Sequence, residues 1–141
     1  MKLSPEERDA IVSYRKQKAH ETLKEAEGIA SLGFWNAVAN RLYYACYYMT
    51  SALLIHYGYT ARSHAGVIRL LGLHFVTTGY IAQRHAKFYT RLFELRQSGD
   101  YDDFYNITED DIKPLIEPAR NYIETVRNLI EAPEKYCEII T

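Results

Sequence analysis

The chain has 141 residues, of which 48% are hydrophobic and 25% are charged, and its formal net charge is -1 at pH 7. These values are typical of one soluble globular domain, and they exclude a global electrostatic attraction to nucleic acid or to an anionic membrane. No apolar run approaches the about 20 residues that a membrane-spanning helix needs, so we expect no membrane contact. Cys46 and Cys137 are isolated from each other and form no disulfide framework, which predicts a reducing, cytoplasmic location.

Two long helices are predicted in the first part of the chain. Ser4–Glu7 combines an N-cap serine, a proline in the first turn and a glutamate three residues after the cap, so a helix begins there. We expect it to continue to about Leu32, before Gly33. The second helix, over about residues 34–57, is apolar almost all round, so the domain or a partner chain should cover most of its surface.

Two helices are predicted in the middle of the chain. A helix over about residues 64–77 has Ser63 as its N-cap. Another, over about residues 81–97, carries an apolar stripe that ends before Ser98 and Gly99. Because glycine commonly follows the last turn of a helix, we expect this helix to stop there.

The last predicted helix spans about residues 108–131. Pro114 and Pro118 conflict with an unbroken helix, so we expect a kink or a later start. No segment shows the alternation of a strand. The sequence therefore predicts an all-α, up-and-down four-helix bundle with an additional short helix, in a single domain over residues 1–131 with a C-terminal tail over 132–141.

Charge is distributed unevenly along the sequence. Residues 61–96 carry six basic side chains and one acidic one, and residues 97–117 carry seven acidic side chains and one lysine. Three interpretations remain open. The two halves pair within the molecule, or the basic part forms a groove for phosphates, or the two parts form a self-complementary dimer face.

The stretch around Arg96 is the strongest candidate for a functional site. Arg96 stands near the end of a predicted helix, and Asp100 and Tyr101 follow within five residues. This pattern is typical either of a polar site or of a helix end followed by a solvated acidic loop. His64, directly after Ser63 at a helix start, is a second candidate that would bind an anion through helix amides. The five histidines show no spacing that indicates a metal, so we predict neither a metal nor a cofactor.

Four motifs, in this order and spacing, resemble one known family, the HEPN domain (higher eukaryotes and prokaryotes nucleotide-binding). The resemblance covers about residues 8–131. The motifs are Asn36-Ala-Val-Ala-Asn-Arg-Leu-Tyr-Tyr-Ala45, Ala52-Leu-Leu54, Ser63-His-Ala-Gly-Val67 and Leu95-Arg-Gln-Ser-Gly-Asp-Tyr-Asp102.

The resemblance implies a helical bundle that forms a homodimer. Many members are encoded beside a minimal nucleotidyltransferase and act in toxin–antitoxin or defence pairs. Catalytic members are metal-independent endoribonucleases with an Arg-x(4–6)-His motif. Here Arg96 matches the arginine, but Tyr101 stands where the histidine is expected, and no histidine follows it. The chain is similar instead to the subgroup with an Arg-x-x-x-Asp-Tyr pattern.

Three functions follow as hypotheses. The first is a non-catalytic component that binds a nucleotide, an RNA phosphate or a nucleotidyltransferase partner through Arg96, Asp100 and Tyr101, with Ser63 and His64 as further phosphate-binding candidates. The second is an endoribonuclease with a rearranged site, whose candidate catalytic residues are Arg96, Tyr101 and His64. The first is favoured, because a tyrosine with a pKa of about 10 is a poor substitute for the imidazole base. The third is a purely structural dimerisation module.

Overall fold

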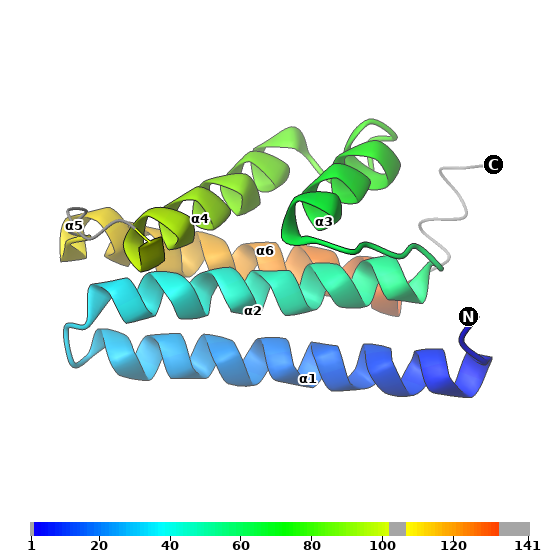
Figure 1. Ribbon diagram of the computed structural model, residues 1–141, viewed down its shortest axis with the longest axis horizontal. Helices are drawn as coiled ribbons and strands as arrows, with labels where there is room; N and C mark the ends of the chain where they lie inside the picture. Colours follow the sequence, from blue (N-terminus) through cyan, green and yellow to red (C-terminus); the bar gives the residue numbers. More distant parts are fainter. Residues whose placement is uncertain (1, 102–106, 133–141) are drawn as a thin grey trace.

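The computed structural model describes residues 2–101 and 107–132, and the side chains of residues 98–101 lie outside this description (Figure 1). In chain order the elements are α1 (Pro5–Ala30), α2 (Trp35–His56), α3 (His64–Leu71), the π-helical turn η1 (Gly72–Val76), α4 (Gln83–Tyr101), α5 (Glu109–Ile112), the 3-10 turn η2 (Lys113–Leu115) and α6 (Ile116–Glu131). No strand occurs among the described residues, and the predicted all-α fold is confirmed.

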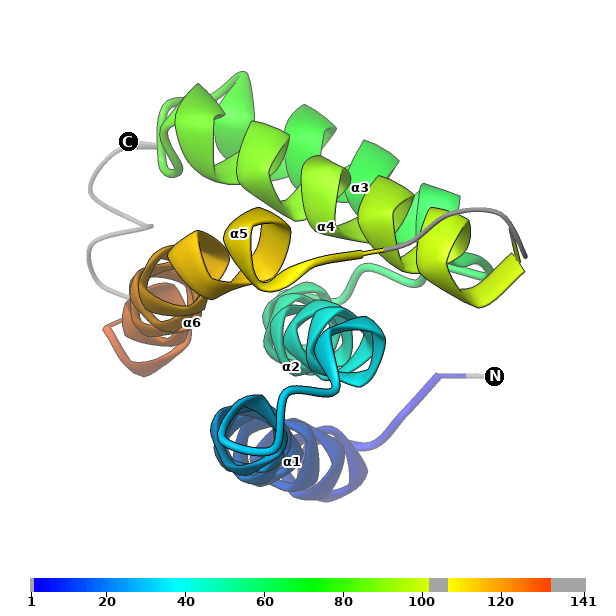
Figure 2. The ribbon, with the colours of Figure 1, turned by 90° about the vertical axis from the view of Figure 1, so that its left-hand side faces the viewer.

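Helix α2 is the centre of the bundle. In the end-on view of Figure 2 it lies between α1 on one side, α6 on another and the α3–α4 pair on a third, and it packs against each of them. Its buried residues run from Val38 to Leu54 and point in almost every direction around the helix. This confirms the prediction that an apolar surface all round this helix has to be covered.

The start of α1 follows the predicted capping box. The Ser4 hydroxyl accepts a hydrogen bond from the Glu7 backbone N–H at 3.1 Å, and the Ser4 N–H donates to the Glu7 carboxylate at 2.9 Å. At the other end, Gly33 has φ +78°, a left-handed conformation that favours glycine and lets the chain turn back into α2. The first two helices therefore begin and end within two residues of their predicted bounds.

The segment predicted as one helix over residues 64–77 changes its hydrogen bonding halfway. It is α-helical as far as Leu71 and then forms the π-helical turn, in which the Thr77 N–H donates to the Gly72 carbonyl at 3.0 Å. The turn Thr77–Thr78–Gly79, with φ +87° at Gly79, then ends it as predicted.

Helix α4 corrects one prediction. It does not stop before Ser98 and Gly99 but continues through both to Tyr101. A glycine inside a helix costs only about 1 kcal/mol relative to alanine, which is too little to end a helix by itself. Asp100 and Tyr101 therefore lie in the last turn of α4, the same helix as Arg96, and not in a loop.

The prolines near the end of the chain break the last helix as predicted. Pro114 lies in the 3-10 turn between α5 and α6, and Pro118 is the third residue of α6. In the first turn of a helix a backbone N–H has no partner to lose, so Pro118 is tolerated there. The predicted tail begins at residue 132, and its residues 133–141 lie outside the description.

Candidate functional site

Tyr43, Tyr44 and Tyr47 of α2 form an aromatic cluster, on which the candidate site is built. Tyr43 is fully buried, and its ring meets the edge of the Tyr44 ring at a centroid distance of 5.2 Å and stacks on the Tyr47 ring at 6.1 Å. Tyr43 and Tyr47 are four residues apart and therefore share one face of the helix. On its other side, Tyr43 lies parallel to Tyr89 of α4, with ring centroids 5.7 Å apart and an angle of 6° between the planes.

His64 reaches these tyrosines because of how α3 begins. Ser63 is the N-cap with φ -149° and ψ 164°, and its hydroxyl accepts a hydrogen bond from the Gly66 N–H at 2.9 Å. His64 is thus the first residue of α3. Its ring centroid lies 4.7 Å from that of Tyr47, and its Nδ1 lies 2.6 Å from the Tyr43 hydroxyl oxygen, a hydrogen bond between α3 and α2.

Arg96 of α4 completes the site. Its guanidinium carbon lies 5.7 Å from the centroid of the Tyr43 ring and 5.2 Å from that of Tyr44. These are cation–π distances, at which the ring faces attract the positive charge. A second guanidinium, that of Arg41, lies 5.3 Å from the Tyr44 centroid. The fold therefore gathers two arginines and one histidine around the same tyrosines.

The electrostatics of the site keep His64 neutral and Tyr43 protonated. Burial lowers the pKa of His64, and the positive charge of Arg96 lowers it further. Burial also raises the pKa of Tyr43 to about 12, against smaller opposing effects of Tyr89 and Arg96. At neutral pH the site thus contains permanent positive charge from its arginines and a neutral imidazole.

The predicted site residues divide into three groups. Arg96 and His64, which are 32 positions apart in the sequence, are brought together by the packing of α3 and α4 on α2. Ser63 lies beside His64, but its hydroxyl caps α3. Asp100 and Tyr101 lie in the last turn of α4, and their side chains are outside the description, so their roles stay predictions.

Sequence reasoning missed the tyrosines of α2 and the second arginine. Arg41, Tyr43 and Tyr44 were noted only as parts of the first family motif. The available signal was the pair of adjacent tyrosines at 43–44, repeated one turn later at 47–48. Adjacent residues on a helix point about 100° apart, so such a pair serves two different neighbours.

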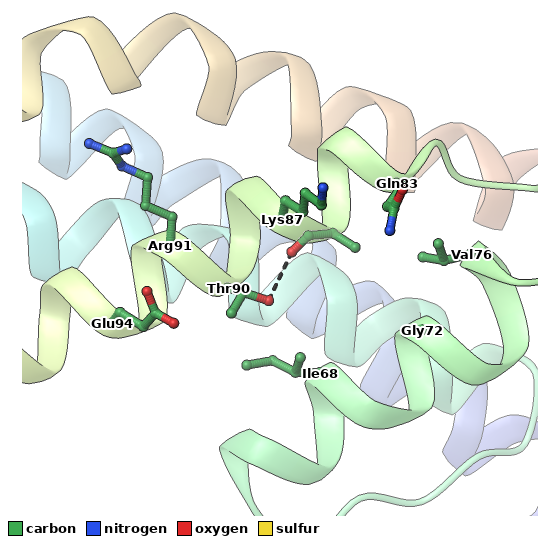
Figure 3. A pocket seen from close by; sticks show the side chains of 9 residues that line it. Ile68, Gly72, Val76, Gln83, Lys87, Thr90, Arg91 and Glu94 are labelled. Carbon is green, nitrogen blue, oxygen red and sulfur yellow. Dashed lines mark hydrogen bonds between the residues drawn. The ribbon is translucent and has the colours of Figure 1, made fainter.

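A groove of about 350 Å³ lies between α3–η1 and α4, the helices that also carry His64 and Arg96 (Figure 3). Ile68, Val76 and Ala86 supply apolar surface. Lys87 and Arg91 stand along its α4 side, where Figure 3 shows their side chains on one helix with that of Glu94. The Thr90 hydroxyl donates to the Ala86 carbonyl at 2.9 Å, drawn as a dashed line in Figure 3, and so is used within α4.

The basic and acidic parts of the sequence meet at one described point. Hydrogen bonds from Thr108 are the main cause of the lowered pKa of Asp111, and the charge of Arg91 lowers it further. Across residues 2–101 and 107–132, no group of three or more histidine, cysteine, aspartate or glutamate side chains is placed to hold a metal ion. No described helix is both long enough and apolar enough to cross a bilayer.

Comparison with known proteins identifies the family. The family model described as "HEPN domain" matches residues 12–129, from the first turns of α1 to the last turn of α6. A protein of Thermotoga maritima named "UPF0332 protein" is 34% identical over 125 residues, which are 89% of this chain and 95% of that protein.

A protein of Methanocaldococcus jannaschii named "Putative toxin MJ0605" is 28% identical over 113 residues, covering 80% of this chain and 84% of that protein. An Archaeoglobus fulgidus protein named "UPF0332 protein" is 23% identical over 116 residues, covering 82% of this chain and 92% of its own length. The match over residues 12–129 spans nearly all of the helical bundle, and the chain belongs to the HEPN domain family.

Proposed function

We propose that this protein is the toxin-type component of a two-protein pair and that it binds a phosphate group of a nucleotide or an RNA at Arg96 without cleaving it. The observation that carries the proposal is the position of the Arg96 guanidinium, 5.7 Å and 5.2 Å from the Tyr43 and Tyr44 ring centroids and beside His64. A guanidinium is planar and rich in donors, which suits two oxygens of one phosphate.

The surroundings of Arg96 support an anionic ligand. Arg41 adds a second positive charge at the Tyr44 ring, offset in part by Glu25, whose carboxylate lies 3.9 Å from it. Lys87 and Arg91 add positive charge along α4 in the groove, where Glu94 offsets part of it and Arg91 also faces Asp111. A ligand with more than one phosphate would reach these two cations beyond Glu94.

The toxin-type role and the partner rest on the comparisons and on the family. The Methanocaldococcus jannaschii relative carries a toxin name, and this proposal extends that role to the present chain. We infer a homodimer and a minimal nucleotidyltransferase as the assembly in which the chain acts. Exposed apolar side chains support a protein contact, since Leu32 is 68% and Phe34 is 64% exposed.

The binding proposal is tested by titrating ATP and a short single-stranded RNA into the wild-type protein and an Arg96→Ala variant. We expect the variant to lose at least about tenfold in affinity, because a hydrogen-bonded charge is removed. Arg84→Ala is the matched control. It removes the same charge from an exposed position on α4, about 18 Å along the helix from Arg96, and should change affinity by no more than about twofold. Equal affinities of wild type and Arg96→Ala, or no binding by either, would contradict the proposal.

The assembly is tested separately. Light scattering of the purified chain should give twice the monomer mass, and co-expression with a nucleotidyltransferase encoded beside it should yield a stable complex. A monomer at micromolar concentration that does not co-purify with such a protein would contradict this part of the proposal and leave the phosphate site unaffected.

One observation favours a second function, that of an endoribonuclease with a rearranged site. The fold brings the imidazole of His64 within the influence of the Arg96 charge, at the same Tyr43 ring, although no histidine follows Arg96 in the sequence. A neutral imidazole is a suitable general base near neutral pH. The test is incubation with structured RNA in EDTA, using His64→Ala and Arg96→Ala. Cleavage that both substitutions abolish would support this function, and intact RNA in the wild-type reaction would exclude it.

A further inference from the structure

We propose that Tyr43 fixes the tautomer of His64, so that His64 Nε2–H joins Arg96 as a hydrogen-bond donor and the pair favours an oxyanion that brings no proton of its own. This inference rests on the proposed phosphate site and makes Tyr43 a positioning residue within it. It begins from the 2.6 Å hydrogen bond between the Tyr43 hydroxyl and His64 Nδ1.

The Tyr43 hydroxyl has a fixed position because its ring is held on several sides. The ring is 0% exposed and lies parallel to Tyr89 at 5.7 Å, with the Tyr44 ring at its edge and Phe93 at 5.7 Å. A buried, close-packed ring of this kind cannot move its hydroxyl oxygen away from Nδ1 without disturbing its neighbours, and only the O–H hydrogen is free to rotate. The protonation of the His64 ring must therefore adjust to the Tyr43 hydroxyl.

The direction of the hydrogen bond follows from counting donors. Tyr43 keeps its proton because burial raises its pKa to about 12. Its hydrogen bond of normal geometry among the described residues is to His64 Nδ1. The Tyr89 hydroxyl also interacts with the Tyr43 oxygen, and it does so as a donor, because this contact lowers the pKa of Tyr43. If Nδ1 carried a proton and donated it, the Tyr43 O–H would be a buried donor without an acceptor, which costs about 1–3 kcal/mol. The Tyr43 O–H therefore donates and Nδ1 accepts.

The neighbouring phenol reinforces this direction. The Tyr89 hydroxyl is buried and has no hydrogen-bond partner of normal geometry in the described part of the chain. It stacks beside Tyr43 and carries a proton of its own, because burial raises its pKa. The Tyr89 O–H is directed to the Tyr43 oxygen, since it lowers the pKa of Tyr43, so the acceptor left for the Tyr43 O–H is the unprotonated Nδ1.

The remaining ring nitrogen, Nε2, must then carry the proton of the neutral imidazole. No hydrogen bond to Nε2 occurs within the described residues, and the atom is not among the buried polar atoms that lack a partner. His64 is half-buried, so this N–H is open to a ligand. With Arg96 it gives the site a second donor of fixed direction.

The Arg96 guanidinium and His64 Nε2–H, as a pair of donors, have a predictable preference. They bind oxygens that carry lone pairs and no proton, as in sulfate or a phosphodiester, and neither of them is an acceptor for the P–O–H group of inorganic phosphate. With the opposite tautomer, Nε2 would accept a hydrogen bond and would favour a protonated phosphate. The two tautomers thus predict different preferences between sulfate, dimethyl phosphate and inorganic phosphate.

The tautomer is measured directly by long-range proton–nitrogen correlation spectra of the histidine rings, with the His64 signals assigned from their absence in His64→Gln. In the wild type, Nε2 should be protonated and Nδ1 should not. In Tyr43→Phe, which keeps the stacked ring, the two tautomers should become mixed. A wild-type ring protonated at Nδ1, or a Tyr43→Phe ring unchanged from the wild type, would overturn the inference.

The effect on the ligand is measured by titrating sulfate, dimethyl phosphate and inorganic phosphate. Wild type should bind the first two at least as tightly as the third, and Tyr43→Phe should weaken sulfate binding about fivefold, the effect of one hydrogen bond. Glutamine presents an amide N–H near the place of Nε2–H and does not depend on Tyr43. Adding Tyr43→Phe to His64→Gln should therefore change sulfate affinity by less than about twofold.

The outcomes separate the inference from the proposed function. A wild-type protein with the fixed Nε2–H tautomer that binds none of the three anions would support the role of Tyr43 and overturn the phosphate site. Anion binding that Arg96→Ala abolishes and Tyr43→Phe leaves unchanged would support the phosphate site and overturn the role of Tyr43. An equal loss from Tyr43→Phe in the wild-type and His64→Gln backgrounds would also overturn it, because Tyr43 would then act on packing alone.

Discussion

Thr50 of α2 and Tyr122 of α6 share a hydrogen bond of 2.6 Å between two side chains that are completely buried. The Thr50 hydroxyl also lies 2.7 Å from the Cys46 carbonyl, to which it donates. The Tyr122 O–H must then be the donor to Thr50, since the threonine has one proton. This bond joins the central helix to the last one.

Removal of the Tyr122 hydroxyl should destabilise the protein. In Tyr122→Phe the ring still fills its place, but Thr50 loses its donor, so the free energy of unfolding should fall by about 1 kcal/mol. Urea unfolding measures it. In a Thr50→Val background the same substitution should cost clearly less, because the bond is already gone. An undiminished cost in that background would mean that the hydrogen bond is not its origin.

Removal of the Tyr89 hydroxyl should not destabilise the protein, in contrast to removal of the Tyr122 hydroxyl. This hydroxyl is buried without a hydrogen-bond partner of normal geometry among the described residues. Tyr89→Phe removes a desolvated polar group and leaves the stacked ring, so the free energy of unfolding should stay within about 0.5 kcal/mol of wild type or rise. Tyr122→Phe is the matched control. A loss as large as that of Tyr122→Phe would show that Tyr89 is hydrogen bonded in solution.

Replacing either of two glycines near the turn between α1 and α2 by alanine should change the stability of the protein, with opposite signs. Gly28 lies inside α1, and an added Cβ would meet no atom within 4 Å. Gly28→Ala should therefore stabilise the protein by about 0.5–1 kcal/mol. Gly33 has equal space but φ +78°, where an L side chain is strained, so Gly33→Ala should destabilise by about 1 kcal/mol. The melting temperatures of both variants test this prediction, and a change in the same direction for both would contradict it.

Stability should fall as the pH falls below about 6.5. The pKa values of His56, His64 and His85 are all lowered, with burial as the largest cause in each case. In the window between the folded pKa values and the ordinary value of about 6.5, the unfolded chain binds more protons, so acid favours unfolding. The slope is at most about 1.4 kcal/mol per pH unit for each histidine.

Urea unfolding at several pH values between about 5 and about 7.5 measures this slope, in a range where carboxylates remain ionised. His85→Gln lies outside the candidate site and should reduce the slope while leaving the stability near pH 7.5 close to that of wild type. A free energy of unfolding that is constant over this range, or that rises toward acid, would contradict the prediction.

Local signals in the sequence predicted most of the helix boundaries. The capping box at Ser4–Glu7, the glycine at 33 and the proline at 114 act through atoms a few residues away, so their effects are readable without the fold. Gly99 was misread because its helix-ending tendency is weak and the helix continues past it. Residue propensities alone could not show whether the tendency of Gly99 to end the helix or the continuation of α4 would prevail.

The candidate site was predicted only in part, for a different reason. Arg96 and His64 were both identified as residues, the former from its family motif and the latter from its helix start. Their proximity depends on how α3 and α4 cross α2, which is decided by packing over the whole bundle. The hydrogen bond from Tyr43 to His64 spans 21 positions and could not be read from any local pattern.

The burial of Tyr43 has a consequence for how this site can change over evolutionary time. The same side chain packs against Tyr89 in the interior and touches His64 and Arg96 at the surface. Most replacements at position 43 would alter ligand preference and weaken the bundle together, so selection on one property constrains the other. The Arg96 side chain is half-buried, so a replacement at position 96 should disturb the interior less than one at position 43. Functional divergence among relatives should therefore accumulate at the rim, through the residues of α4, while the tyrosine beneath persists.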